Sequence, residues 1–317
     1  ELGVYFTSLE TSDKHHYYDD VIFTSEKSIE KDILSLKSDF VTANIEGQID
    51  VPNIFNSLLA YLYPHFPLLG GSSNFIQDFE FKVEISNTSA LTELFIPSVN
   101  FEQGTRCYGS FRNRGEGLKL VLETPGFSWD KFAFNNLNLN ALISEKDWAV
   151  NLLGEKCYYD DGTLIEDFSL NQLGSYGVSN YVLNWESSDS VKYEGGLNGI
   201  VNMDQTSLKI FLDESQFYFA DTLWTLKDSS YFHYFNGKFN SQASISTVSQ
   251  DVRFNYISND FIDTVGLALN HFDMTNISPW LSNLNTTLKG KLNGDVLVVR
   301  DTLNNKLYSD IISSNLL

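Results

Sequence analysis

Cysteine, methionine and proline are scarce in this sequence, which contains 2 Cys, 2 Met and 6 Pro among 317 residues. Two cysteines can neither staple a small disulfide scaffold nor supply the four thiolates of a structural zinc site. Basic residues are also few: 21 Lys and Arg stand against 41 Asp and Glu, and the formal net charge is −20. Because such a chain repels phosphate backbones and anionic membrane surfaces, the composition excludes a nucleic-acid-binding protein.

Recognisable catalytic and cofactor motifs are also missing. The sequence contains no Walker loop, dinucleotide fingerprint, nucleophile elbow, HExxH or EF-hand loop. His15 and His16, with Asp19 or Asp20, come nearest to a metal-binding pattern, but adjacent residues of an extended segment point to opposite faces. We therefore expect a polar loop or strand end there, and we expect no metal site and no cofactor in the chain.

Acidic and aromatic residues lie close together at one place, which raises the alternative of a glycosidase or a sugar-binding protein. Asp160, Asp161, Glu166 and Asp167 are followed and preceded by tyrosine and tryptophan residues. With 41 acidic residues in the chain, such neighbours arise by chance. We interpret these carboxylates as turn formers around Gly162, and we expect no catalytic residue and no enzymatic activity.

The two cysteines do not form a reactive pattern. Cys107 and Cys157 each precede a tyrosine, and neither has a histidine nearby in the sequence that would make it a nucleophile. One disulfide in an oxidising compartment and two free, buried thiols are both compatible with these surroundings. The sequence leaves both possibilities open.

Apolar and aromatic residues are abundant, at 42% and 14%, and they alternate with polar residues. Residues 79–85 place four apolar side chains on one face of a strand and three charged side chains on the other. Similar segments recur, separated by turns of Asn, Gly, Asp and Ser. This pattern predicts an all-β fold of antiparallel strands. The apolar residues expected to line one face are Phe79, Phe81, Val83, Ile85, Leu118, Leu120, Leu122, Leu137, Leu139, Leu208, Ile210, Leu212, Val252, Phe254 and Tyr256.

Two short segments break this alternation. Residues 51–62 have apolar side chains at helical spacing, within a run of residues 51–77 that contains no Asp, Glu, Lys or Arg. Residues 276–284 show a similar spacing. The patterns predict short helices near 52–62 and 278–284. These helices are either connectors that cover the ends of a sheet or elements that plug or gate an apolar channel.

A five-residue pattern, apolar–x–Gly–x–apolar, recurs along the chain. A glycine between two apolar residues of one face suits a strand that bends or bulges. The recurrence predicts stacked, similar β units arranged as an array rather than as a closed globule. The pattern occurs at residues 45–49, 107–111, 197–201, 235–239, 288–292 and 292–296.

The region of residues 204–270 carries more specific motifs. A strand pattern begins at Ser207 and reaches Trp224, a second follows at residues 234–239, and a third at residues 250–258 begins with glutamine. The helix expected after it is followed by Gly290 and Gly294. This order of motifs resembles the central region of the translocation and assembly module B (TamB) family, in the form found in Bacteroidota. Residues 37–47 resemble an earlier instance of the same unit.

The resemblance implies an AsmA-like repeating β-groove: a long curled antiparallel sheet with an open hydrophobic groove. Residues 1–317 would be one continuous segment of it, made of stacked β units, with the N-terminal membrane anchor and the C-terminal domain outside these residues. Such proteins cross the periplasm from an inner-membrane anchor to the outer membrane. The implied function is conduction of phospholipid between the two membranes, support of outer-membrane protein assembly, or both. The implied partners are phospholipid acyl chains and an Omp85-family outer-membrane protein similar to TamA or BamA.

Two other functions remain as alternatives. A secreted β-solenoid or sandwich that binds polysaccharide would present its aromatic residues as an exposed flat platform. A structural envelope adhesin would pack two sheets face to face around a filled core. An open apolar groove would favour the lipid-conducting bridge over both.

Overall fold

The structure is a computed structural model that describes residues 2–10, 15–29, 31–71, 75–86, 99–159, 162–186, 192–219, 221–259, 262–276, 289–301 and 305–314. Contacts within the chain divide it into two compact units, Glu1–Gly177 and Val178–Leu317. We describe each unit by itself.

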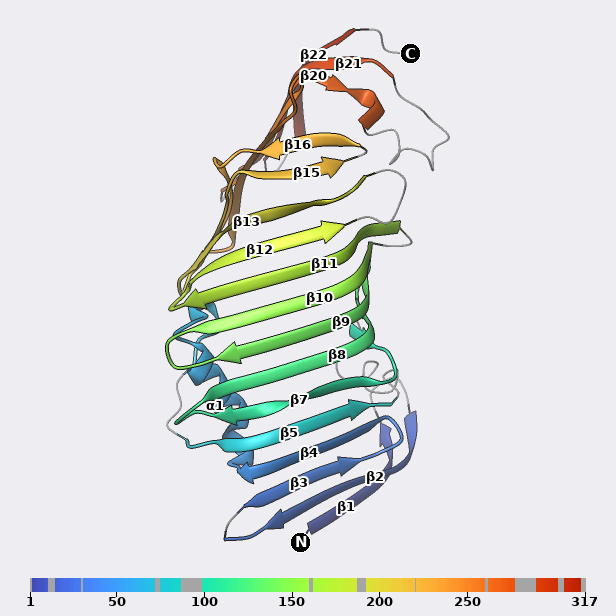
Figure 1. Cartoon of the computed structure of the whole chain (residues 1–317), viewed down its shortest axis with the longest axis vertical. Helices are drawn as coiled ribbons and strands as arrows, with labels where there is room; N and C mark the ends of the chain where they lie inside the picture. The colour runs from blue at the N-terminus through green and yellow to red at the C-terminus, as the bar shows by residue number, and fades with distance from the viewer. Residues whose placement is uncertain are drawn as a thin grey trace. The chain divides into compact units, whose positions relative to one another are not determined.

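The first unit is an antiparallel sheet that the chain builds hairpin by hairpin (Figure 1). Strands β5 and β8 both pair with β7, while β6 pairs with the far part of β8, so β6 and β7 act as one interrupted strand. The described strands are β1 (Leu2–Glu10), β2 (His15–Lys27), β3 (Asp32–Lys37), β4 (Val41–Gln48), β5 (Asp78–Ile85), β6 (Val99–Phe101), β7 (Thr105–Arg112), β8 (Gly117–Trp129), β9 (Phe132–Ile143), β10 (Trp148–Tyr159) and β11 (Gly162–Ser175).

The second unit is built in the same way. Strand β13 pairs with both β14 and β15, and β18 pairs with both β16 and β17, so each of these couples replaces one longer strand. The described strands are β12 (Val178–Glu186), β13 (Gly195–Met203), β14 (Ser207–Leu212), β15 (Ser215–Phe219), β16 (Thr222–Leu226), β17 (Ser230–Phe235), β18 (Lys238–Ser246), β19 (Asp251–Ser258), β20 (Ile262–Asp273), β21 (Lys291–Asp301) and β22 (Asn305–Ser314).

The all-β, antiparallel fold expected from the alternation is confirmed. The helix expected near 52–62 is also confirmed, as a 3-10 turn η1 (Val51–Asn53) followed by α1 (Ile54–Leu62); a second turn, η2 (Pro67–Leu69), follows them. The helix expected near 278–284 lies outside the described residues. Figure 1 shows α1 lying across one face of the sheet of the first unit.

A buried polar network ties the helical segment to the sheet. Gln77 is fully buried; its Oε1 accepts from the Asp50 backbone N–H at 3.0 Å, and its Nε2 donates to the Asp50 carbonyl at 3.1 Å. The Gln77 N–H donates to Asn113 Oδ1 at 3.1 Å. Asp50 precedes η1 and Asn113 follows β7, so these bonds hold both ends of the segment while satisfying groups that are cut off from water.

Local departures from regular strand geometry accompany the curl of the sheet. Asn136 in β9, Asp167 in β11 and His271 in β20 have φ of 47°, 40° and 51°. Left-handed residues of this kind occur where a strand bulges and its twist increases. The register of β20 against β21 shifts at the same place, between Leu269 and Phe272. The strands therefore bend around one face rather than lying flat.

The recurrent glycine pattern has more than one structural meaning. Gly109 and Gly199 lie inside strands, where an added Cβ would collide with the carbonyl oxygens of Lys119 and Phe211 on the neighbouring strand. Gly237 was expected to bend a strand, and that expectation is wrong. It forms, with Asn236, the two-residue turn between β17 and β18, where φ is 49° at Asn236 and 78° at Gly237. An Asn-Gly pair adopts this turn with little strain.

Replacing Gln77 tests the polar network. Gln77→Ala removes both partners of the Asp50 backbone and leaves a buried N–H and carbonyl unsatisfied, so we expect the free energy of unfolding to fall by about 1–3 kcal/mol in a urea titration. Gln103→Ala is the matched control, because Gln103 is exposed in a turn; it is expected to change stability by less than about 0.5 kcal/mol. Equal effects of the two substitutions would contradict the role given to the network.

Candidate functional site

The strand register of the first unit brings the predicted apolar residues to one face. Phe79 lies opposite Phe111, which lies opposite Leu118. One step along, Phe81 and Leu120 lie on either side of Gly109. Directly opposed residues of an antiparallel pair project to the same side, and so do residues two apart on one strand. All the candidates of β5, β8 and β9, from Phe79 to Leu139, therefore share this face.

This face is covered only in part. Phe79 and Leu137 are 6% and 9% exposed, whereas Phe81, Val83 and the other candidates of these strands are half-buried. Among the described residues, Val21, Phe40 and Val41 form the one cluster of fully buried apolar side chains. A closed core would bury the whole row of such residues. In the part of the chain that the structure describes, the apolar face is thus an open groove on the curled sheet, as the resemblance implied.

The opposite face of the same strands is polar. Arg112 pairs with Asp78 at 3.0 Å and with Glu80 at 2.9 Å, and Lys82 pairs with Glu84 at 2.9 Å. Their carboxylates and Lys82 are largely exposed and Arg112 is half-buried, so each pair contributes little stability. Their effect is to keep this side of the sheet in water while the other side remains apolar.

Aromatic side chains mark both ends of the apolar face. At one end the helical segment packs on it: the ring of Tyr61 in α1 lies 5.5 Å from that of Phe111, and the ring of Phe66, after α1, lies 4.8 Å from that of Trp148. His65 is 1% exposed, and its Nε2 lies 2.9 Å from the Ser144 carbonyl. Helix α1 therefore covers a sheet end, which is one of the two roles that the sequence left open for it.

Among the described residues, aromatic rings in tilted, stacked and edge-on pairs cover the other end. The ring of Phe127 lies 5.0 Å from that of Phe101 and 5.9 Å from that of Phe134, which lies 6.0 Å from that of Phe168. Nearby, Thr105 and Thr124 are buried and join through their hydroxyls at 2.6 Å. Because these two hydroxyls bond to each other, they are not free to bind a polar group of a ligand on the face.

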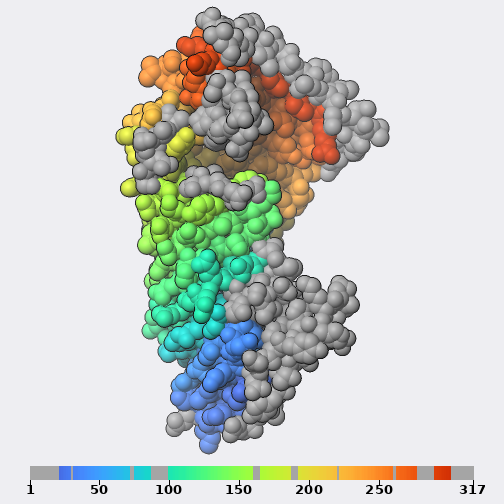
Figure 2. All heavy atoms as spheres, turned by 90° about the vertical axis from the view of Figure 1, so that its right-hand side faces the viewer, coloured from blue at the N-terminus to red at the C-terminus, as the bar shows by residue number. Residues whose placement is uncertain are grey.

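The second unit repeats the separation into two faces. Ile210 lies opposite Phe232, which lies opposite Ser241, which lies opposite Tyr256. Leu208, Leu212, Val252 and Phe254 belong to the same face by the same register, so it collects all the candidates of β14 and β19. Leu212 is 8% exposed, but Phe254 is 37% exposed. In Figure 2 the orange-coloured part of this unit is hollowed.

Several residues of this face escaped sequence reasoning. Tyr234 and Phe239 lie opposite each other beside Leu208, and Trp224, only 2% exposed, has its ring 6.3 Å from that of Phe272. The five consecutive aromatic residues 231–235 hide the alternation, because both faces of β17 carry rings. The neighbouring strand β18 does alternate, and pairing the two across the Asn-Gly turn would have assigned the faces.

One tyrosine of this unit, Tyr181, is half-buried. Burial, reinforced by the negative charge of Asp213, raises the pKa of Tyr181 to about 12. Its hydroxyl donates to the Phe211 carbonyl at 3.3 Å. Tyr181 lies opposite Gly199, so it faces the apolar side and remains neutral at any physiological pH.

Asp160 and Asp161, two of the acidic residues singled out in the sequence, lie outside the described residues. In the part of the chain that the structure describes, no three His, Cys, Asp or Glu residues gather as metal ligands. Glu166 was expected to be a turn former, and that is wrong: it lies within β11, is buried, and pairs with Lys156 at 2.8 Å. No described helix has the length and hydropathy needed to cross a membrane.

We compared the chain with protein families, curated proteins and solved structures. No protein-family model matches the chain, and no curated protein and no solved structure matches it.

Both cysteines are free thiols in the structure; Cys157 is buried and Cys107 is half-buried. Cys107 belongs to the apolar face of the first unit, since it lies between Val83 and Leu122. Burial raises the pKa of both thiols above the ordinary value. The reactive thiolate is therefore depleted at neutral pH.

Alkylation of Cys107 measures this environment. In a Cys157→Ser variant we expect iodoacetamide to react with folded protein several-fold more slowly at pH 8 than with the same chain in guanidinium chloride, because burial disfavours the thiolate. The rate should rise with pH, with a midpoint above that of a free cysteine, in a mass-spectrometric time course. A rate equal to that of the unfolded chain would contradict the placement of Cys107.

Proposed function

We propose that this chain is a segment of a periplasm-spanning bridge of the Gram-negative envelope that conducts phospholipid between the inner and outer membranes in its groove. One observation carries the proposal: in each unit, apolar side chains such as Phe81 and Ile210 line one face and remain half-exposed. A soluble surface seldom leaves so long an apolar face uncovered unless a ligand or partner occupies it.

Acyl chains suit this face physically. Each methylene shielded from water contributes about 0.8 kcal/mol, and hydrocarbon needs no hydrogen-bond partner from the wall. The polar groups of the face are largely bonded within the protein, as with Thr105 and Thr124. The acidic, ion-paired opposite face keeps the conduit in water and repels anionic headgroups from that side.

The remaining parts of the proposal concern what lies outside the chain. The protein would be anchored to the inner membrane by an N-terminal helix and would reach the outer membrane through a C-terminal domain. An Omp85-family protein similar to TamA or BamA would be its partner there, and support of outer-membrane protein assembly would be a second role. Catalysis has no part in this function, since conduction needs only a continuous apolar wall.

The two alternatives fit the geometry less well. A polysaccharide platform needs aromatic rings that lie flat in one plane, but the ring of Phe239 is tilted by 34° to that of Phe232 and by 44° to that of Tyr256. An adhesin needs a filled core, whereas Phe254, Phe239 and Tyr234 are 37%, 38% and 43% exposed on the apolar side of the second unit.

Charges placed in the groove test conduction. Phe81→Glu and Ile210→Glu each put a carboxylate on an apolar face, and hydrocarbon that passes it must lose its apolar contact or desolvate the charge. We expect each substitution to reduce phospholipid transfer between donor and acceptor vesicles at least about tenfold, since desolvating one charge costs more than 1.4 kcal/mol.

Matched controls place the same charge on the opposite face. Phe211→Glu changes the neighbour of Ile210, and Leu142→Glu changes an apolar residue that is 56% exposed on the polar side of the first unit. Both are expected to transfer lipid at the rate of the unmodified chain. Transfer that survives several groove charges together, or that falls equally with the controls, would refute conduction in the groove.

Native mass spectrometry of the purified chain gives the most direct result. We expect phospholipid to remain bound under gentle ionisation, and we expect Phe81→Glu to lose part of it. A chain that carries none after incubation with phospholipid vesicles would count against the proposed function.

A further inference from the structure

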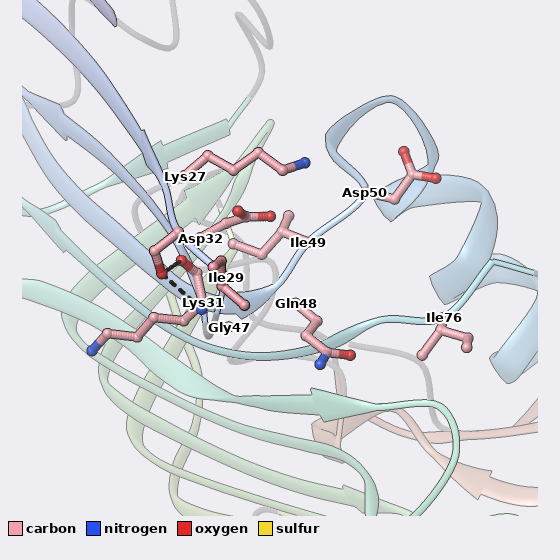
Figure 3. Close-up of a pocket in the computed structure, with 10 residues that line it drawn as sticks. Lys27, Ile29, Lys31, Asp32, Gly47, Gln48, Ile49, Asp50 and Ile76 are labelled. Atoms are coloured by element: carbon pink, nitrogen blue, oxygen red, sulfur yellow. Dashed lines mark hydrogen bonds between the residues drawn. The ribbon is translucent and has the colours of Figure 1, made fainter. Parts of the chain in front are cut away.

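A pocket of about 340 Å³ lies at one end of the apolar face of the first unit, beside the start of the helical segment (Figure 3). Its lining combines three isoleucines, Ile29, Ile49 and Ile76, with charged residues. This volume is within the range of small-ligand sites. The pocket lies at the end of β2, the start of β3 and the end of β4. Helix α1 packs on other strands of the same sheet.

The charged residues of the pocket stand on the same side of the sheet as the groove. Lys27 lies opposite Asp32, Asp32 opposite Gly47, and Gly47 opposite Phe79. One step further in, the same side carries Leu34 and then Leu36. The face thus changes from charged at the pocket to apolar along the strands.

Two of these charges are not engaged by the protein. Among the described residues, neither the Lys27 ammonium nor the Asp32 carboxylate has a hydrogen-bond or ion-pair partner. Lys31, by contrast, pairs with Glu46 and points away from the pocket in Figure 3. In the same view the Lys27 side chain reaches toward the loop that carries Asp50.

Asp50 adds a second carboxylate in a fixed position. Its backbone is held by both polar atoms of Gln77, and its Oδ2 accepts from Asn53 Nδ2 at 3.0 Å. The pocket therefore offers one free ammonium and two carboxylates, with the half-buried Ile49 beside them and the exposed Ile29 and Ile76 at its rim. A purely anionic group would meet these carboxylates and a chain of net charge −20. A group with a phosphate and an ammonium fits better.

We propose that this pocket holds the headgroup of a zwitterionic phospholipid, phosphoethanolamine or phosphocholine, with the acyl chains lying on the apolar face of β2–β5. Lys27 binds the phosphate, and Asp32 and Asp50 bind the ammonium. Ile29, Ile49 and Ile76 contact the glycerol and the first methylenes. This inference rests on the proposed function, which it extends from the groove to the place and type of the headgroup.

The length of the apolar stretch agrees with this placement. Four residue steps separate Lys27 from Phe23, which is half-buried on the same face; at about 3.3 Å per residue they span about 13 Å, and Val21, which is 2% exposed, closes the row beyond them. One leaflet of a bilayer holds its acyl chains in about 15 Å, half of the hydrocarbon core. A headgroup at Lys27 thus leaves room for most of an extended acyl chain along the half-buried part of the strands.

Headgroup selection by the purified chain tests the proposal. The chain is incubated with vesicles of equal phosphatidylethanolamine and phosphatidylglycerol, re-isolated, and analysed for bound lipid by native mass spectrometry. We expect phosphatidylethanolamine to be retained preferentially. Asp32→Lys should shift the ratio toward phosphatidylglycerol about threefold to fivefold, and Lys27→Glu should lower retention of both lipids, as expected for partly exposed charges.

Lys37→Glu and Asp39→Lys are matched controls, because both residues are exposed outside the pocket; they should leave the ratio unchanged. Asp32→Asn, a smaller change, serves if Asp32→Lys fails to fold by circular dichroism, and should reduce the preference in the same direction. An unchanged ratio in the Asp32 variants, with lipid still lost in Phe81→Glu, would overturn the headgroup site and leave the groove function standing.

Absence of bound lipid in every variant, including the unmodified chain, would overturn both proposals. A third arm uses glycerophosphoethanolamine, the water-soluble headgroup without acyl chains. It should compete only weakly with the intact lipid, because it lacks the apolar contacts of the groove. Competition by this compound as strong as that by the lipid itself would show a site for the free headgroup and overturn the assignment of a phospholipid.

Discussion

The structure depends on the register of antiparallel strands. Directly opposed residues project to the same side, so a row such as Phe79, Phe111 and Leu118 stays together only while each hairpin keeps its alignment. A slip by one residue would exchange the apolar face for the polar one along a whole strand. The short connections between successive strands and the glycines at close approaches, such as Gly109, keep this alignment.

An open face follows from this arrangement, because the described part of each unit offers its apolar residues little cover beyond α1 and a few rings. Tyr61 of helix α1 and Phe66, which follows the helix, cover one end of the face, and the buried Gln77 holds the segment in place. Under the proposed function, hydrocarbon completes the burial of these rows. The same openness makes the face a candidate site for hydrocarbon, whereas a packed core would bind nothing.

The charged side chains follow the same division into a polar and an apolar face. The ion pairs of Arg112 and Lys82 lie on the polar face, and the unpaired charges of Lys27 and Asp32 stand at the end of the apolar one. A sheet with this pattern has one apolar face, one polar face, and an end at which charged and apolar side chains lie together. A ligand with a charged part and an apolar part fits this end of the sheet. Neither the apolar face nor the polar face would bind both parts of such a ligand.

Alternation in the sequence predicted the strands around Phe81 and Ile210, and helical spacing predicted α1, because these patterns reflect the local geometry of the backbone. It also named the residues of the apolar faces, since one face of a strand is set by a period of two. Local patterns could not place the aromatic residues 231–235 on their faces, distinguish the turn at Gly237 from a bend, or put Glu166 beside Lys156. Composition, with its few basic residues and many acidic ones, likewise does not say where the charges of Lys27 and Asp32 lie in the fold. Those features, and the place of Lys27 and Asp50 in the lining of one pocket, arise only when hairpins pair and a loop is bonded across the sheet, because they join residues that are distant in sequence.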